Sequence, residues 1–141
     1  MKVLVDTNVI IDVLLKQEPF HKDSFVVFRL ADSGSIKGVL AAVSMTNVFF
    51  LLRKARKDTA DVYQIMDKLT TLFTVAPINE TTIANALSLR WKDFEDAVQY
   101  VTAKENNVDY IITRNETDYK ASDIPCVSAT DFIAHLRKSE K

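Results

Sequence analysis

The chain has 141 residues, of which 48% are hydrophobic, and this composition is typical of a globular protein and excludes an intrinsically disordered chain. A formal net charge of −1 predicts no strong general affinity for nucleic acid, so any such contact requires a local basic patch. The single cysteine excludes a disulfide framework within the chain, and no apolar run is long enough to span a membrane, so we expect one cytoplasmic domain, residues 1–141, with no membrane contact.

Short apolar runs and helical periodicities alternate along the chain. Continuous apolar runs, rather than alternating ones, are typical of strands in a parallel sheet that is covered on both faces. In chain order we predict a strand at 3–5, a helix at 21–33, a strand at 39–43, helices at 44–53 and 59–72, a strand at 73–76, a helix at 94–106, strands at 110–113 and 126–127, and a helix at 129–138. Ser44 is the expected N-cap of the helix at 44–53. The order predicts an α/β fold, a three-layer α/β/α sandwich with a central parallel sheet of four to five strands.

Polar residues follow the ends of the predicted strands. Ligands of open parallel sheets bind at the carboxyl ends of the strands, so these residues are candidates for a site. They are Asp6 after the first strand, Asn47 in the helix after the second, Asp93 and Asp96 at the start of the helix before the fourth, and Arg114, Asn115 and Asp118 after the fourth.

The carboxylates of Asp93 and Asp96 share one face of a helix because they are three residues apart. Glu95 points about 100° away from Asp96 and is the weaker candidate. Acidic residues also favour helix N-termini, so an alternative is that this segment only complements the helix dipole on a solvated face.

Several carboxylates that meet at one sheet edge repel one another unless a cation neutralises them. A hard divalent ion such as Mg²⁺ or Mn²⁺ resolves this repulsion and supports phosphoryl chemistry. The two histidines, His21 and His135, lie in regions that do not converge on this edge, so the site is not expected to contain a histidine that could bind zinc or act in catalysis.

Four short motifs in order resemble the PIN domain, the fold of the bacterial toxin ribonucleases called VapC. The motifs are Val-Leu-Val-Asp6-Thr7-Asn8, Ser44-Met-Thr-Asn47, Asp93-Phe-Glu-Asp96-Ala97 and Thr113-Arg114-Asn115-x-x-Asp118-Tyr119, and together they cover nearly the whole chain. In two places the sequence departs from the family pattern. Asn47 stands where many members have glutamate, and Asn115 stands where aspartate is frequent.

The resemblance implies roles for these positions. Asp6 and Asp96, with Asn115, are expected to hold Mg²⁺ or Mn²⁺, while Asp93 and Asp118 add the negative charge that the two asparagines lack. The expected supporting residues are Thr7, Asn8, Asn47 and Thr113. Alternatively, Thr7 and Asn8 form a structural turn that caps the first helix. Asp12 is interpreted as a solvated or helix-packing residue.

A basic rim is expected to hold the phosphates of RNA beside the acidic pocket. Arg114 lies at the pocket mouth by its motif position, and Arg53 and Lys54 belong to the densest basic run, residues 53–57. For that run the alternative is a charged helix end, where cations are favoured. Phe49 and Phe50 are adjacent and cannot both face one core, so one of them is a candidate for a homodimer surface.

The resemblance implies a metal-dependent endoribonuclease that acts as the toxin of a toxin–antitoxin pair, with an RNA substrate, an antitoxin partner and a homodimeric state. A non-catalytic PIN-like module that binds RNA or a protein partner is the alternative, motivated by Asn47 and Asn115. A phosphatase or phosphotransfer domain built on Asp6 is a third class, but the second aspartate two residues on that haloacid-dehalogenase-type phosphatases use is missing.

Overall fold

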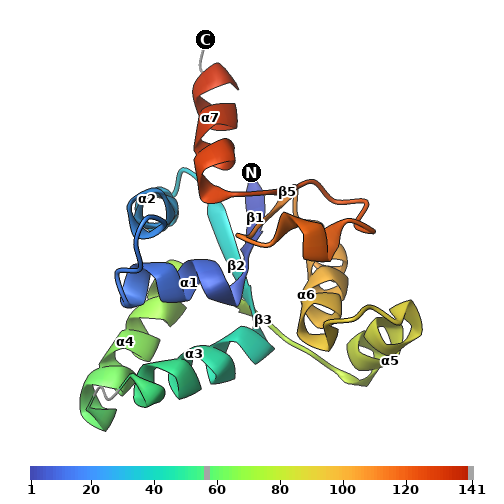
Figure 1. Ribbon diagram of the computed structural model, residues 1–141, viewed down its shortest axis with the longest axis horizontal. Helices are drawn as coiled ribbons and strands as arrows, with labels where there is room; N and C mark the ends of the chain where they lie inside the picture. Colours follow the sequence, from blue (N-terminus) through green and yellow to red (C-terminus); the bar gives the residue numbers. More distant parts are fainter. Residues whose placement is uncertain (56–57, 140–141) are drawn as a thin grey trace.

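A computed structural model describes residues 1–55 and 58–139 of the chain. A central sheet is covered by helices on both faces, so the predicted three-layer α/β/α sandwich is confirmed (Figure 1). The elements are β1 (Lys2–Val5), α1 (Thr7–Leu14), α2 (His21–Asp32), β2 (Lys37–Ala41), α3 (Ala42–Lys54), α4 (Thr59–Leu72), β3 (Thr74–Ala76), α5 (Glu80–Leu89), α6 (Phe94–Glu105), β4 (Tyr110–Ile112), the 3₁₀ helix η1 (Glu116–Tyr119), β5 (Cys126–Val127) and α7 (Ala129–Ser139).

The sheet has five parallel strands in the order β3-β2-β1-β4-β5. The order reverses at β1, whose neighbours are β2 on one side and β4 on the other. The carboxyl ends of these three strands therefore lie side by side, which is where ligands bind in open parallel sheets. Asp6 directly follows β1, at the centre of this edge.

Alternate residues of each strand enter two separate cores. Val3, Val5, Leu40 and Ile112 belong to the core shared with α1, α2, α3, α4 and α7. Leu4, Val39 and Ile111 belong to the core shared with α5 and α6. Because both faces of every central strand are covered, a continuous apolar run is the pattern such strands need. Each fully buried aliphatic side chain contributes about 1.5–3 kcal/mol by leaving water.

The end of the second strand and the start of the helix that follows it differ from the sequence-based expectation. The second strand was expected to reach residue 43 with Ser44 as N-cap, but α3 begins at Ala42, its N-cap is Ala41, and Ser44 is fully buried inside the helix. The N-cap prediction for Ser44 is therefore wrong. No range was predicted for helix α1, and helix α5 was not predicted. Its signal was the capping box in which Asn79 accepts from the backbone of Thr82 while the Thr82 hydroxyl accepts from the backbone of Asn79.

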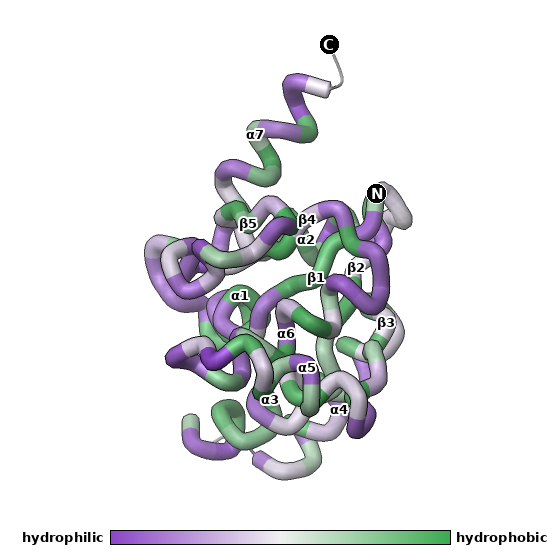
Figure 2. The backbone as a smooth tube through the Cα atoms, turned by 90° about the vertical axis from the view of Figure 1, so that its right-hand side faces the viewer, coloured by the Kyte–Doolittle hydropathy of each residue, from purple (hydrophilic) through white to green (hydrophobic). Residues whose placement is uncertain are grey.

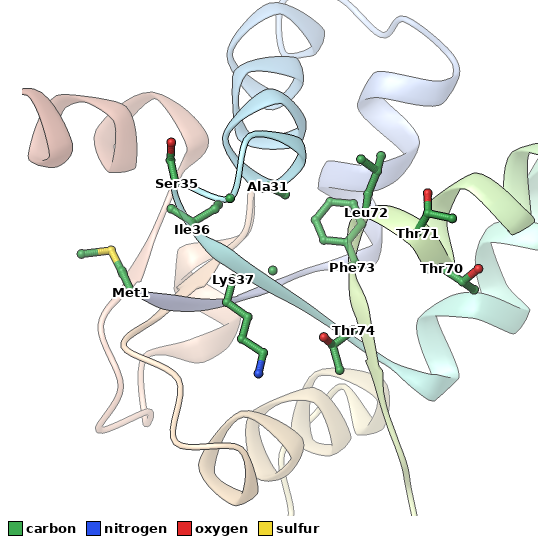
Figure 3. Close-up of a pocket in the computed structure, with 12 residues that line it drawn as sticks. Met1, Ala31, Ser35, Ile36, Lys37, Thr70, Thr71, Leu72, Phe73 and Thr74 are labelled. Carbon is green, nitrogen blue, oxygen red and sulfur yellow. The ribbon is translucent and has the colours of Figure 1, made fainter.

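Gly38 in β2 is required by a close approach of Phe73, the residue between α4 and β3. The Phe73 ring lies beside the start of β2, where it lines a hollow of about 460 Å³ together with Met1, Lys37 and Thr74 (Figure 3). A Cβ atom at position 38 would overlap the Cδ1 and Cε1 atoms of this ring. The ring cannot retreat easily, because it packs edge-on against Phe28 with the ring centroids 5.2 Å apart.

We therefore expect Gly38→Ala to lower the free energy of unfolding by about 1–3 kcal/mol through overpacking. Thermal unfolding followed by circular dichroism measures the loss. Phe73→Leu removes the ring, so Gly38→Ala should cost less in that background than in the wild type. An equal loss in both backgrounds would contradict the steric explanation.

Helix α7 extends away from the rest of the chain at the side of β5 (Figures 1 and 2). Phe132 and Ile133 on its inner face are buried. Among the described residues, none of the helices combines the length and the apolar character that crossing a membrane requires.

Candidate active site

The carboxylate of Asp6 is held at the sheet edge by several donors. Asp6 is 4% exposed and is the residue that joins β1 to α1. Gln99 Nε2 donates to Asp6 Oδ1 over 3.0 Å, and Thr113 Oγ1 donates to Oδ2 over 2.8 Å. Asn8 Nδ2 also lies 3.4 Å from Oδ2. These contacts come from α1, α6 and the end of β4, so the tertiary fold determines the orientation of this carboxylate.

Asp96, in the first turn of α6, meets Asp6 at the Tyr119 hydroxyl. This hydroxyl lies 3.3 Å from Asp6 Oδ2 and 3.3 Å from Asp96 Oδ1, so its single proton lies within hydrogen-bonding distance of both carboxylates. Burial, followed by the charges of the two carboxylates, raises the pKa of Tyr119 far above its ordinary value of 10.0, so this hydroxyl remains a proton donor. Residues 90 positions apart in the chain therefore belong to one cluster of polar side chains.

Burial, followed by the negative charges of Asp6, Asp93 and Asp118 in that order of importance, raises the pKa of Asp96 from its ordinary value of 3.8 to about 7. The side chain is 8% exposed. The carboxyl groups of Asp6, Asp93, Asp96 and Asp118 are therefore close enough to repel one another. Such mutual repulsion is what a bound cation would relieve.

The raised pKa of Asp96 predicts how the metal-free protein responds to pH. The folded state retains the Asp96 proton up to about pH 7, whereas the unfolded chain loses it near 3.8. Because the folded state binds more protons in this window, its stability falls as pH rises from about 4 to about 7. Asp96→Asn mimics the protonated form, so in EDTA at pH 8 we expect it to add about 1–3 kcal/mol to the free energy of unfolding.

Chemical denaturation at pH 8 and pH 4.5 measures this effect, and the gain should largely vanish at pH 4.5. Asp67→Asn, an exposed position on α4, is the matched control and should change little at either pH. An equal gain for Asp96→Asn at both pH values would show that charge repulsion is not its source.

A second cluster of hydroxyl and carboxyl groups surrounds Thr7. Its Oγ1 lies 2.9 Å from Glu95 Oε1 and 2.8 Å from Ser44 Oγ, while Ser44 Oγ donates to Gln99 Oε1 over 3.5 Å. Thr7 is the first residue of α1, whose N-cap is Asp6, so the alternative that Thr7 and Asn8 cap this helix is wrong. Glu95, the weaker candidate by helical geometry, is thus linked to the Asp6 region through Thr7.

The remaining sequence-predicted acids and amides lie around this centre. Asp93 is the N-cap of α6 and accepts from the backbone N–H of Asp96, and Asp118 is exposed on η1. Asn115 is exposed, and its backbone N–H donates to Thr113 Oγ1 over 3.1 Å. Asn47 lies one turn after Ser44 on α3. It is half-buried, and across the described ranges its side chain makes no hydrogen bond.

Arg114 is engaged with Asp12 rather than with the acidic centre. Asp12 was interpreted as a solvated or helix-packing residue; it is completely buried within α1, so the solvated alternative is wrong and the helix-packing one agrees with the structure. Arg114 Nε lies 2.9 Å from Asp12 Oδ2, and its guanidinium stacks over the Phe20 ring at 4.5 Å from the centroid. Although the two charges touch, in the described part of the chain neither oxygen of Asp12 has a partner with good hydrogen-bond geometry.

Two of the predicted RNA contacts lie away from the acids. Arg53 and Lys54 are exposed in the last turn of α3, and Ser44 lies at the opposite end of that helix. Nine residues of helix separate Ser44 from Arg53, or about 13 Å. Their location agrees with the alternative of a charged helix end. Residues 56 and 57 of the same basic run lie outside the described residues.

The oxygen donors at the site suit a hard divalent cation. Asp6 and Asp96 present carboxylate oxygens to a shared point, and further negative charge comes from Asp93 and Asp118. Within the described ranges, no three His, Cys, Asp or Glu side chains form a ready metal cage. Mg²⁺ needs only one or two protein carboxylates and keeps several waters, so two converging aspartates are compatible with it.

Sequence reasoning missed Gln99, Tyr119 and the structural role of Ser44. Gln99 is fully buried and lies three residues after Asp96, so helical spacing places both on one face of α6. A buried polar residue among Ala97, Val98 and Val101 was the available signal. For Tyr119 the signal was its place directly after Asp118 in the fourth motif.

Comparison with known proteins gives consistent similarities in sequence and fold. A PIN domain family model matches residues 2–117. Ribonuclease VapC1 of Aquifex aeolicus (strain VF5) is 26% identical over 138 residues, which cover 93% of this chain and 92% of that protein.

Solved structures with the same fold include three bacterial examples. VapBC-1 from nontypeable Haemophilus influenzae has a TM-score of 0.69 at 18% identity and covers 92% of this chain and 99% of that one. VapBC2 from Rickettsia felis, bound to a fragment of promoter DNA, has a TM-score of 0.69 at 13% identity, covering 91% and 98%. VapC20 of Mycobacterium tuberculosis, described as a toxin that cleaves the sarcin–ricin loop, has a TM-score of 0.68 at 16% identity, covering 84% and 94%. The family model spans most of the chain, and the chain therefore belongs to the PIN domain family.

Proposed function

We propose that the chain is a metal-dependent endoribonuclease that hydrolyses RNA phosphodiester bonds at the cleft between Asp6 and Asp96. The observation that carries the proposal is the meeting of these two carboxylates at one hydroxyl, Tyr119, on the carboxyl edge of the sheet. The similarity to Ribonuclease VapC1 supports the same reaction class. Asp6, Asp96 and Asn115 would hold Mg²⁺ or Mn²⁺, and Asp93 and Asp118 would strengthen its binding by their charge.

A divalent ion at this place would neutralise charge and assist the in-line displacement at phosphorus. The chain's own residues orient and support the site. Gln99 and Thr113 fix the Asp6 carboxylate. The other proposed supporting residues are Thr7, which contacts Glu95, Asn8, which contacts Asp6, and Asn47. Helices α1 and α3 both begin at this edge, and their positive N-terminal dipoles favour the phosphate of a substrate. Arg114 is the nearest of the three proposed RNA-contacting cations, and Arg53 and Lys54 would bind more distant phosphates.

Several of the similar structures are complexes of a toxin with its antitoxin. By analogy with these complexes, we propose that this chain acts as a toxin in the cytoplasm and that it binds an antitoxin protein. A homodimer is also proposed. Phe50 on α3 is 64% exposed, whereas the adjacent Phe49 is half-buried and packs on Tyr63 with the ring centroids 5.1 Å apart. Phe50 is therefore the side chain that is available for such a contact.

The proposed activity is tested with purified chain, a labelled single-stranded RNA and Mn²⁺, Mg²⁺ or EDTA. We expect cleavage with either ion and none in EDTA. Attack of water with departure of the 3′ oxygen leaves a 5′-phosphate and a 3′-hydroxyl, so end analysis by mass spectrometry separates this reaction from a metal-independent nuclease, which leaves a cyclic phosphate. Absence of cleavage of any RNA with either ion would overturn the proposal.

The alternative is a non-catalytic PIN module, and it is favoured by the two neutral residues Asn47 and Asn115 at positions where the family often has acids. Isothermal titration with Mn²⁺ decides between the two. Measurable binding that disappears in Asp6→Asn supports the enzyme, whereas no binding at millimolar Mn²⁺ supports the module.

A further inference from the structure

A cavity of about 390 Å³ opens directly beside the acidic centre. Its walls are the turn between α5 and α6, which contributes Trp91, Lys92 and Asp93, and the segment around η1, which contributes Asp118 and Lys120. Two of the lining residues, Asp93 and Asp118, also raise the pKa of Asp96. The cavity therefore shares two of its carboxylates with the surroundings of Asp96. Its volume lies within the range of pockets that bind small ligands.

The aromatic wall of this cavity is held rigidly. Trp91 stacks on Tyr100, with centroids 5.0 Å apart and planes inclined by 26°, and meets Tyr119 edge-on at 6.0 Å. Tyr119 is the residue whose hydroxyl lies between Asp6 and Asp96. The indole is only partly buried, and it is the single tryptophan of the chain. Packing against two tyrosines thus fixes an aromatic surface one side chain away from the carboxylates.

Two cations complete the cavity. Lys92 and Lys120 are exposed, and in the part of the chain that the structure describes neither forms an ion pair. An unpaired lysine beside the acids has no evident structural role in the fold. An aromatic surface with cations beside it is the combination that binds a nucleotide, because the base stacks on the ring and the phosphate pairs with the cations.

We propose that this cavity binds one nucleotide of single-stranded RNA next to the bond that is cut, with the base against Trp91 and its phosphate at Lys92 and Lys120. This proposal rests on the proposed function, since it assumes that the next phosphate of the same RNA strand lies at Asp6 and Asp96. Only an unpaired nucleotide can enter, because a base within a duplex is stacked on its neighbours. A purine covers more of the Trp91 ring than a pyrimidine does, so we expect the cavity to bind purine nucleotides more tightly than pyrimidine nucleotides.

Intrinsic fluorescence of Trp91 reports entry of a base without any need for cleavage. The experiment titrates the Asp96→Asn variant of the 141-residue chain in EDTA with a 12-nucleotide single-stranded RNA, with the same RNA as a duplex, and with polyphosphate. We expect quenching by the single strand and little change with the duplex or polyphosphate. Equal quenching by polyphosphate would show a purely electrostatic effect and overturn base stacking.

Binding is measured in parallel by anisotropy of fluorescently labelled RNA, for which variants can be compared. Trp91→Leu removes the stacking surface and should weaken binding by about tenfold. Since Trp91 packs on Tyr100 and Tyr119, this variant could lose stability, and Lys92→Glu and Lys120→Glu provide an independent test at exposed positions. Each should weaken binding by at least about fivefold at low salt. Lys37→Glu, an exposed lysine at the amino end of β2, is the matched control and should change binding less than twofold.

The outcomes separate this proposal from the proposed function. If wild-type protein cuts RNA but quenching is absent and both lysine variants bind normally, the nucleotide subsite is wrong and the catalytic site stands. If quenching and lysine effects appear but no RNA is cut, the cavity stands as a nucleotide-binding site, and the catalytic proposal fails together with the placement of that nucleotide beside a cut bond. A lack of both quenching and anisotropy change overturns the subsite outright.

Discussion

Asp6→Asn and Asp96→Asn are each expected to reduce cleavage of single-stranded RNA by more than about 10³-fold at saturating Mn²⁺, because each removes one of the two carboxylates that meet at the Tyr119 hydroxyl. An amide of the same shape preserves packing but brings no negative charge for a cation. Initial rates of cleavage of a labelled oligonucleotide, taken under single-turnover conditions, measure the loss. The Mn²⁺ affinity from calorimetry should fall in the same variants.

The fold should survive both substitutions. Asp96→Asn is even expected to stabilise the metal-free protein at pH 8, since it removes the repulsion that raises the pKa of Asp96 to about 7. A variant that is more stable and yet inactive separates catalysis from folding. Asp67→Asn serves as the control and should cut at the wild-type rate. Variants of Asp6 or Asp96 that cut as fast as wild type would remove the basis of the enzymatic proposal.

The second large effect concerns the buried ion pair. Arg114→Gln leaves the Asp12 carboxyl buried without its cation, and loss of one partner of a buried pair costs about 3–5 kcal/mol when the remaining group stays charged. Asp12 already has a raised pKa, chiefly through burial, and the Arg114 charge opposes that rise. Without Arg114 the carboxyl will protonate more readily, which limits the loss. We expect a decrease of about 2–4 kcal/mol at pH 7, or about 5–15 °C in Tm.

The pH dependence of this loss has a definite sign. The pKa of Asp12 lies above its unfolded value of 3.8 in the folded protein, so the cost of burying the charge grows as pH rises above that value. The difference in Tm between wild type and Arg114→Gln should therefore be larger at pH 8 than at pH 4.5. The Asp12→Asn/Arg114→Gln double variant restores a neutral pair and should recover most of the loss. A double variant that is no more stable than Arg114→Gln would contradict the explanation.

The buried ion pair also changes how Arg114 is expected to act on RNA. The motif placed this arginine at the pocket mouth, but its guanidinium is shared between Asp12 and the Phe20 ring. Most of its charge is therefore already compensated. Lys92 and Lys120, which form no ion pair in the described part of the chain, are better placed to hold a phosphate next to the acids, and neither of them belongs to the dense basic run at residues 53–57.

The layers of the fold and the general location of the site can be predicted from the amino-acid sequence. Continuous apolar runs at β1, β2 and β4 indicate strands that are buried on both faces, and a polar residue at the end of a parallel strand lies at the ligand-binding edge by topology. Asp6 could be placed from this rule alone. Periodicity also placed Asp93 and Asp96 at the start of a helix, because hydrophobic spacing and acidic first turns are local properties of the chain.

The contacts between side chains at the site, in contrast, are visible only in the folded molecule. Gln99 and Tyr119 reach Asp6 across 93 and 113 residues of chain, and Arg114 meets Asp12 in the same way. Local pattern carries no information on such partners, because they depend on how helices from different parts of the chain pack against one sheet and on the rotamers that this packing permits. The same holds for the cavity at Trp91, whose two walls come from segments that are adjacent only in the folded molecule.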